Sequence, residues 1–172
     1  VRWFEEYALN DFHLFGTGWD MPPMRYGKIG RAMTRLQGRT GKMIGIKFFP
    51  SYRGRVTSKL ETLRKFKYSF CYENVTGYDG YITEKIFDCF YAGTVPVYWG
   101  APDIENHIPE NCYIRFEQFQ DFNQLWNFVS SMSIDEWQGY RNSIKEYLSS
   151  RSFAQHFHAM EEMIGIPLGC KK

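Results

Sequence analysis

The chain has 172 residues, 44% of them hydrophobic and 19% aromatic, and its formal net charge is +2. This length and hydrophobic content suffice for one globular domain with a proper core. No apolar run approaches the roughly 18 residues that a membrane-spanning helix needs, so the sequence predicts no such helix.

The first residues, Val1–Leu9, carry apolar side chains at helical spacing and predict a helix. A strand is predicted next, over Phe12–Gly16. Arg2 lies in the predicted helix, where an arginine is by itself most simply an exposed surface cation.

The stretch from Arg25 to Lys67 is strongly basic. It holds 13 of the 21 Lys and Arg residues and one acid, Glu61, so its local charge is 13 − 1 = +12. Such asymmetry indicates an anionic partner, either a nucleic acid or an anionic membrane surface. Five glycines are predicted to interrupt any long basic helix here: Gly27, Gly30, Gly38, Gly41 and Gly45. The alternative is a flexible, solvated insertion at about 25–60.

The segment Lys67–Gly100 predicts a β-loop-α-β unit. A strand over Lys67–Glu73 is followed by a polar, Gly-containing loop over Asn74–Tyr81. Thr83 is a good N-cap for a helix that ends near Gly93. A second strand is predicted over 94–99, although its proline, Pro96, argues against a central position in a sheet.

The start of this helix is a candidate phosphate site. Helix N-termini present unpaired amides and partial positive charge, which favour phosphate. Lys85 stands in the first turn, where a cation works against the helix dipole, so a purely structural role is less attractive. Glu84 beside it could accept hydroxyls of a ribose. The alternative is a solvated helix start with nothing bound.

The C-terminal third predicts further helices. A short helical turn is expected over 102–106, a strand over 112–116 and a helix over 123–132. Ser133 and Glu136 match a capping box, and Ser152 repeats the device. The four cysteines have no metal-ligand spacing, and we expect reduced thiols rather than disulfides: Cys71, Cys89, Cys112 and Cys170. His156 and His158 lie on different helix faces and do not predict a metal site.

About thirty consecutive residues, YENVTGYDGYITEKIFDCFYAGTVPVYWG, resemble the signature of the α-1,3-fucosyltransferases, glycosyltransferase family ten. The similarity extends upstream through Tyr52-Arg53-Gly54 and more loosely to Val1-Arg2. It implies an α/β fold with a Rossmann-like parallel sheet flanked by helices, the C-terminal donor half of a GT-B glycosyltransferase. It also implies one GDP-fucose binding domain over 1–172, with the N-terminal acceptor domain outside this chain.

The resemblance also implies a set of site residues. Asn74, Tyr81, Glu84 and Lys85 fall on family positions that contact the nucleotide sugar, and Arg2 falls on one that meets the diphosphate. Lys85, Glu84 and Arg2 are the expected catalytic residues. No metal ligands are expected, because the DxD motif of metal-dependent transferases is absent, and a divalent ion is not strictly required.

The expected function is an inverting transfer of L-fucose from GDP-fucose to a glycan hydroxyl, O3 of GlcNAc or Glc. The general base is expected in the acceptor domain, so this chain alone should transfer little. Alternatives are a transferase that uses another GDP sugar, and an anion-binding module that binds nucleic acid or a membrane surface through the basic stretch, with the membrane surface the favoured partner. The lack of paired C-terminal cysteines favours a bacterial enzyme, cytoplasmic or at the inner membrane face and linked to lipopolysaccharide, over a Golgi enzyme.

Overall fold

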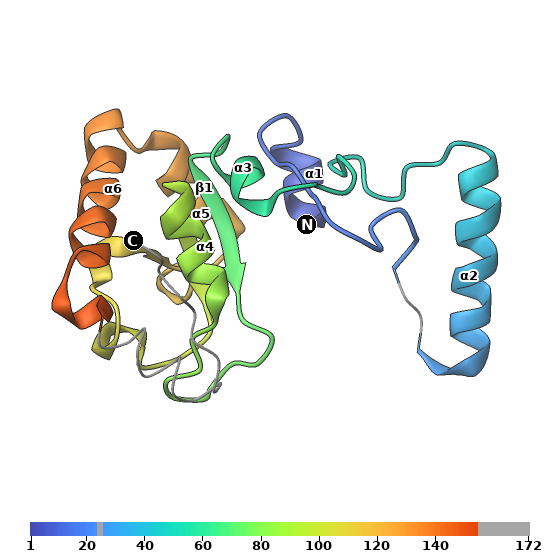
Figure 1. The fold of residues 1–172 in the computed structure, drawn as a ribbon. Coiled ribbons are helices and arrows are strands. Elements are labelled where there is room, and N and C mark those ends of the chain that lie inside the picture. Colours follow the sequence, from blue (N-terminus) through green and yellow to red (C-terminus); the bar gives the residue numbers. More distant parts are fainter. Residues whose placement is uncertain (24–25, 155–172) are drawn as a thin grey trace. The chain divides into compact units, whose positions relative to one another are not determined.

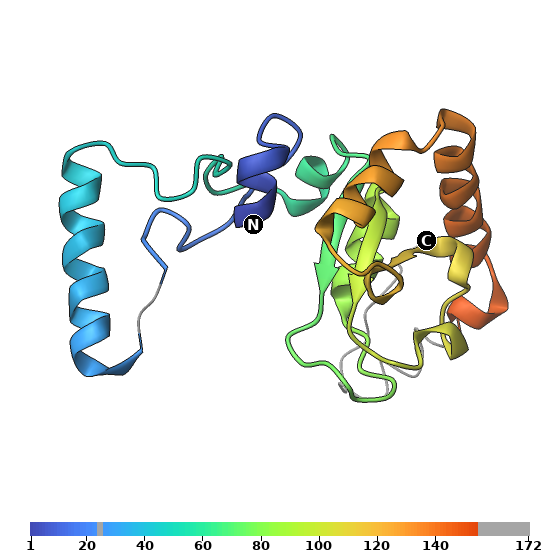
Figure 2. The ribbon, with the colours of Figure 1, turned by 180° about the vertical axis from the view of Figure 1, so that it is seen from behind.

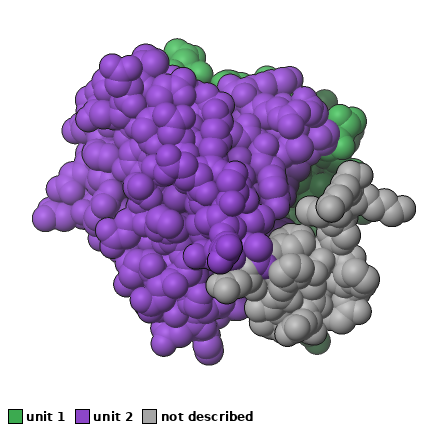
Figure 3. Space-filling view, turned by 60° about the vertical axis from the view of Figure 1, so that its left-hand side comes forward, with its two compact units in different colours: residues 1–57 green, residues 58–172 purple. Residues whose placement is uncertain are grey.

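The computed structural model describes residues 1–23 and 26–154. These residues form two compact units, unit 1 over Val1–Thr57 and unit 2 from Ser58 onward (Figures 1 and 3). Each unit has buried apolar side chains of its own. A single nucleotide-sugar binding domain over 1–172 therefore stays a prediction.

The described residues of unit 1 form two helices, α1 (Arg2–Tyr7) and α2 (Gly27–Met43). Helix α1 buries Phe4, whose ring stacks on Phe12 with centroids 5.0 Å apart. The Glu5 carboxylate accepts hydrogen bonds from the backbone amide and the hydroxyl of Ser51, at 3.1 and 2.8 Å. These bonds tie α1 to the segment that follows α2.

The strand predicted over Phe12–Gly16 is wrong. Leu14 forms one isolated parallel bridge with Tyr52, and no strand is present among the described residues of unit 1. The amide of Leu14 donates to Ser51 and its carbonyl accepts from Arg53, at 3.0 and 2.8 Å. The amide of Gly16 also donates to the carbonyl of Gly54, at 3.1 Å, so the two segments stay paired over a short stretch that is too irregular to form a strand.

The prediction that glycines break up the basic stretch is also wrong, because α2 runs unbroken for 17 residues. Glycine costs about 1 kcal/mol relative to alanine inside a helix, but two of these glycines permit close packing. A Cβ on Gly38 would lie 2.3 Å from Met21 Cε, and one on Gly41 would lie 2.4 Å from Phe48 Cζ. Gly45, with φ +75°, ends the segment in a left-handed conformation.

Unit 2 is a parallel sheet with helices on both faces. Its helices and strands follow one another as α3 (Lys59–Leu63), β1 (Tyr68–Tyr72), α4 (Glu84–Ala92), β2 (Val95–Trp99), η1 (Ile104–Asn106), η2 (Glu110–Cys112), β3 (Ile114–Arg115), η3 (Phe116–Gln118), α5 (Phe122–Ser131) and α6 (Ile134–Leu148). The strand order is β1-β2-β3, all parallel. The predicted α/β class is confirmed.

Alternation along β1 separates the two faces of the sheet. Cys71 is buried on the side of α4, where its interaction with the Cys89 thiol, together with burial, raises the pKa of the Cys71 thiol. On the opposite face the Tyr68 hydroxyl lies 3.1 Å from the sulfur of Met132, just beyond α5. Figures 1 and 2, seen from opposite sides, show α4 in front of the sheet in one view and α5 in front in the other.

Pro96 lies in the central strand, which the sequence argued against. The amide of Val95 donates to Lys67 beside β1, so the next residue along β2 faces away from β1. The pairing of β2 with β3 begins only at Val97. The missing N–H of Pro96 therefore falls where no β3 residue would have accepted it.

The predicted helix ends are largely confirmed. Thr83 caps α4, Gly93 ends it with φ +73°, and Ser133 and Glu136 form a complete capping box at α6. The final helical turn begins two residues earlier than predicted, because Ser150 rather than Ser152 is the cap: the hydroxyl of Ser150 accepts from the amide of Phe153 at 3.1 Å.

Three of the four cysteines are free and buried: Cys71, Cys89 and Cys112. Burial raises the pKa of the Cys112 thiol to about 12. The predictions for Cys170, His156 and His158 lie outside the described residues. No helix among residues 1–23 and 26–154 is long and apolar enough to cross a membrane.

Candidate functional site

The candidate site lies at the carboxyl end of β1, where the chain leaves the sheet and enters α4. Polar loops gather at this edge because parallel strands all end there, which makes it the usual ligand edge of such sheets. The loop over 74–81 joins β1 to α4, and Thr83 is the N-cap. The predicted loop, helix start and strand are thus arranged as the sequence indicated.

Lys85 joins three parts of this edge. Its ammonium donates to the carbonyl of Tyr72 at 3.0 Å, to the Glu73 carboxylate at 3.2 Å and to the side-chain oxygen of Asn74 at 3.0 Å. The side chain is 25% exposed, so solvent reaches part of it. The positive charge is thereby fixed at the mouth of the loop, beside the N-terminus of α4.

Glu73 is the site residue that the sequence analysis missed. Its side chain is completely buried, and its carboxylate accepts from the amide of Thr83 at 2.8 Å and from the Thr83 hydroxyl at 2.8 and 3.0 Å. The Glu73 carboxylate also accepts from the ammonium of Lys85, so the donors to its side chain all belong to the first residues of α4 and its N-cap. The sequence did offer one indication: Glu73 directly follows an aromatic strand. A carboxylate buried at such a position must be paired with hydrogen-bond donors.

Gly100, just after β2, leaves room for this carboxylate. A Cβ on residue 100 would lie 2.6 Å from Glu73 Cγ and 2.6 Å from the hydroxyl oxygen of Tyr98. That hydroxyl accepts from the amide of Ala101 at 3.0 Å, and burial raises the pKa of Tyr98 to about 12. The ends of β1 and β2 are therefore packed against each other at the site.

Asp103 anchors the far end of the loop. Its carboxylate accepts from the amide of Gly80 at 2.7 Å and lies 3.0 Å from Nε2 of His107. The bond from the Gly80 amide, with a smaller contribution from His107, holds the pKa of Asp103 below its usual value. The loop is thus held by Lys85 at its start and by Asp103 near its end.

Three further residues predicted to contact the donor lie in the loop or at the start of α4, and all three are exposed. Asn74, Tyr81 and Glu84 are exposed, and only Asn74 bonds directly to the ammonium. Glu84 is the first residue of α4, and the structure records no hydrogen bond from its side chain within the described part of the chain. These side chains are available to a ligand that reaches Lys85.

Arg2, the fifth predicted residue, belongs to unit 1. Its guanidinium donates to Glu5 at 2.9 Å and to the carbonyl of Phe48 at 2.8 Å, and it lies 4.3 Å from the centroid of the Phe49 ring. These contacts hold the side chain across α1 while leaving much of it exposed.

An aromatic cluster adjoins the carboxyl ends of the strands. The Tyr72 ring lies 5.5 Å from that of Trp99 and 5.4 Å from that of Phe116. The hydroxyl of Tyr72 is buried without a hydrogen-bond partner in the described residues, and burial raises its pKa. Trp99 is partly exposed, so part of its apolar surface is accessible at the end of β2.

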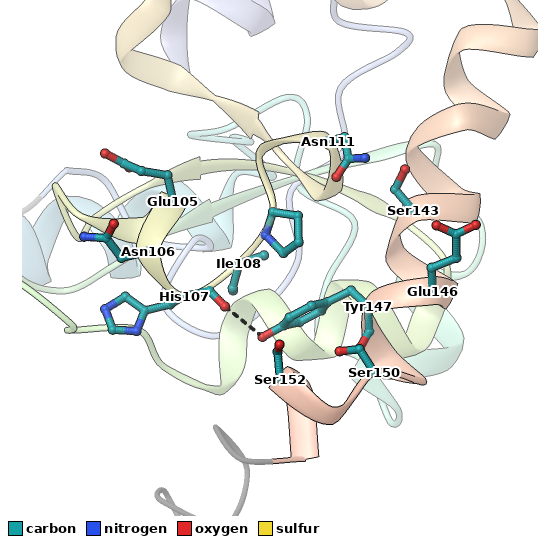
Figure 4. A pocket seen from close by; sticks show the side chains of 11 residues that line it. Glu105, Asn106, His107, Ile108, Asn111, Ser143, Glu146, Tyr147, Ser150 and Ser152 are labelled. Carbon is teal, nitrogen blue, oxygen red and sulfur yellow. Dashed lines mark hydrogen bonds between the residues drawn. The ribbon is translucent and has the colours of Figure 1, made fainter.

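A separate polar hollow of ≈ 430 Å³ lies between η1 and α6 (Figure 4). The Tyr147 hydroxyl donates to the carbonyl of His107 across it, at 3.2 Å. None of the five predicted donor-contacting residues lines this hollow. Four of these residues lie in the β1–α4 loop or at the start of α4, and the fifth, Arg2, lies in unit 1.

The described residues contain no group of three or more His, Cys, Asp or Glu side chains placed to hold a metal. Asp103 and Glu105 are the carboxylates nearest in sequence to the end of β2. The pKa of Glu105 is lowered, first by its own backbone amide and then by Arg115, whose Nη1 lies 2.7 Å away. Lowered pKa values make both groups weak bases.

The sequence profile described as "Glycosyltransferase family 10 (fucosyltransferase) C-term" matches residues 35–164. The chain is 34% identical over 74 residues to the alpha-(1,3)-fucosyltransferase FucT of Helicobacter pylori, covering 43% of this chain and 15% of that protein. It is 45% identical over 97 residues to GDP-fucose protein O-fucosyltransferase 3 of Xenopus tropicalis, and this match covers 51% of this chain and 20% of that protein. The chain thus spans a fifth or less of these relatives.

Crystal structures of α1,3-fucosyltransferase are also similar. One with GDP is 27% identical, with a TM-score of 0.48, and the match covers 52% of this chain and 26% of that one. One with GDP-fucose is 17% identical, with a TM-score of 0.49, and the match covers 88% of this chain and 49% of that one.

Proposed function

Since the chain belongs to glycosyltransferase family 10, the fucosyltransferase family, we propose that it is the donor-binding part of an enzyme that transfers L-fucose from GDP-fucose to an acceptor hydroxyl. One observation carries the proposal. The ammonium of Lys85 is held at the mouth of the β1–α4 loop, beside a helix N-terminus, by two neutral acceptors and one buried carboxylate. This arrangement suits the diphosphate of a nucleotide sugar.

Binding of a diphosphate at Lys85 requires an exchange of partners, because the three hydrogens of the ammonium already have acceptors. Asn74 is the exposed one of these acceptors, whereas Glu73 is buried and bonded to Thr83. A phosphate oxygen would therefore replace Asn74. The released amide could then donate to the phosphate, which fits its predicted role as a donor contact.

The chemistry follows from where charge develops. The acceptor oxygen attacks the anomeric carbon from the face opposite the diphosphate, the bond from that carbon to the phosphate oxygen breaks, and its electron pair stays on GDP. Lys85 and the first-turn amides of α4 would stabilise this charge, and Arg2 is the proposed second cation. Glu84 would hold the ribose or face the sugar. A divalent ion is then not strictly required.

The proton of the acceptor hydroxyl needs a base, which we do not assign to this chain. Asp79, Asp103 and Glu105 are the nearby candidates, and the pKa values of the last two are lowered. The isolated chain is therefore expected to bind GDP and to transfer little fucose. Appreciable transfer by the isolated chain would instead identify one of these acids as the base.

The acceptor proposed from the signature is O3 of GlcNAc or Glc in a glycan. The name of the Xenopus relative gives a protein acceptor instead, so a peptide hydroxyl is the alternative. A transferase that uses another GDP sugar is the second candidate. A competition experiment between GDP-fucose and GDP-mannose shows which of the two donors the site prefers. The cellular location stays a prediction.

The test is calorimetric titration of the chain with GDP. Lys85→Ala and Arg2→Ala are each expected to weaken binding at least tenfold, about 1.4 kcal/mol. Glu84→Ala is expected to weaken it severalfold. Lys145→Ala removes an exposed lysine of α6 and is the matched control, with no expected change. Equal affinity of the control, Lys85→Ala and the unchanged chain would refute the site.

A further inference from the structure

Helix α2 packs against its own unit through one narrow face. The residues of this face are small, and they recur at three- or four-residue spacing: Gly30, Thr34, Gly38 and Gly41. Thr34, Gly38 and Gly41 are buried, and both glycines lie in close contact with apolar side chains of unit 1. One side of the helix is therefore fixed, and the rest of its surface faces outward.

A second face of α2 carries large apolar side chains that are exposed. The exposed fractions are 79% for Ile29, 47% for Met33, 64% for Leu36 and 87% for Met43. Their spacing of four, three and seven residues places them on one stripe along the helix. Ile44, just past the helix, extends the stripe and is also exposed. Folded proteins rarely leave a continuous apolar stripe of this kind uncovered.

A third face is cationic. Lys28, Arg31, Arg35 and Arg39 recur at three- or four-residue spacing and are exposed. The helix sequence contains no acidic residue, and none of these four side chains forms an ion pair with the described part of the chain. Arg39 follows Leu36 by three residues, so the cationic face borders the apolar stripe.

We propose that α2 binds the surface of an anionic membrane, with the apolar stripe in the headgroup boundary and the cationic face on lipid phosphates. A basic helix with one apolar face, lying in the plane of the interface, is the usual form of such a contact. A flat surface meets one side of a helix, which suits α2 because its small-residue face is already packed. Protein grooves that enclose a helix would need that face as well.

A second copy of this chain is the less suitable partner. Two α2 helices joined along the apolar stripe would bring Arg39 and Lys28 of each copy together, and neither helix has an acid to pair with them. Anionic lipids supply the missing charge. The proposal is independent of GDP binding, because α2 contains none of the proposed donor contacts.

The test is sedimentation of the whole chain with vesicles of phosphatidylcholine alone and with about a third phosphatidylserine. Binding to the anionic vesicles is expected, with at least tenfold weaker binding to neutral ones and a steep loss as salt rises to about 1 M. Arg35→Gln with Arg39→Gln should reduce partitioning about 25-fold, since each basic group near the surface contributes about fivefold. Ile29→Ser with Leu36→Ser should reduce it at least tenfold.

The matched control is Lys145→Gln, an exposed lysine on α6, which should leave partitioning unchanged. Circular dichroism and the GDP affinity of every variant show whether it is folded, so a failure of donor binding is distinguished from a failure of this proposal. Absence of binding to anionic vesicles, or binding that both double variants retain, would overturn the proposal. A dimer in solution that Ile29→Ser with Leu36→Ser dissociates would overturn it as well, because the stripe would then be covered by a second copy.

Discussion

Replacing the buried carboxylate Glu73 by glutamine tests whether this residue organises the start of α4. Glutamine has the same shape, and its oxygen can still accept from the amide of Thr83. Its NH₂ group, however, must then face the Thr83 hydroxyl or the ammonium of Lys85, where a carboxylate oxygen now lies at 2.8 and 3.2 Å respectively. The variant therefore loses the charged bond to Lys85.

The magnitude follows from burial. A hydrogen bond to a charged group contributes about 1.5–3 kcal/mol, and breaking a fully buried ion pair costs about 3–5 kcal/mol. Glu73 is completely buried but Lys85 is 25% exposed and keeps two other acceptors, so we expect a loss at the lower end. Glu73→Gln should reduce the free energy of unfolding by about 2–3 kcal/mol, which lowers Tm by about 4–12 °C.

The assay is urea unfolding followed by circular dichroism. Glu84→Gln makes the same chemical change at the exposed first residue of α4 and should cost less than about 0.5 kcal/mol. A double-mutant cycle with Lys85→Met should give a coupling of at least about 1 kcal/mol. If Glu73→Gln and Glu84→Gln unfold at the same urea concentration, the role assigned to Glu73 is refuted.

Further predictions concern the caps and the loop. Gly93→Ala forces a Cβ onto a residue with φ +73° and should destabilise the fold by about 1 kcal/mol. Gly139→Ala lies inside α6 with open space around it and should stabilise the fold by up to about 1 kcal/mol. Thermal unfolding should therefore show a lower Tm for the first variant and a higher Tm for the second. Ser133→Ala removes a capping box and should cost about 1 kcal/mol in the same assay, and an unchanged Tm would contradict this. The folded pKa of Asp103 is lowered, so its bond to the amide of Gly80 is complete above the unfolded pKa and is lost as pH falls through the folded one. Hydrogen exchange at Gly80, corrected for intrinsic rates, should begin to lose protection only below about pH 4, and protection that stays constant as the pH falls from about 7 to about 2 would exclude this role.

The local elements of unit 2 could be predicted from the sequence because their signals lie within a few residues. Thr83, Gly93 and Ser133 are cap residues whose effect depends on neighbouring amides, and all three act as expected. The strands were equally readable from their aromatic and β-branched content. The family resemblance grouped Asn74 and Lys85 as donor contacts, and the two side chains are in direct contact.

Non-local packing could not be predicted in the same way. The glycines of α2 led to the prediction of a broken helix. The sequence does not show that Met21 packs against Gly38 and Phe48 against Gly41. Glu73 was overlooked for a related reason. Its burial depends on Gly100, which lies 27 residues away in the sequence but lies next to the carboxylate in the fold.

The absence of room for a side chain at residue 100 has a consequence for recognition. The strand ends, the carboxylate of Glu73 and the ammonium of Lys85 are ordered together as the sheet folds, before any ligand arrives. Conformational entropy at these positions has already been lost, so ligand binding needs to order only exposed groups such as Asn74 and Tyr81. A smaller side chain at a residue that packs against Gly100, such as Tyr98, would leave Glu73 more mobile in the absence of ligand. Ligand binding would then have to order Glu73 as well, so affinity would fall although every ligand contact is kept.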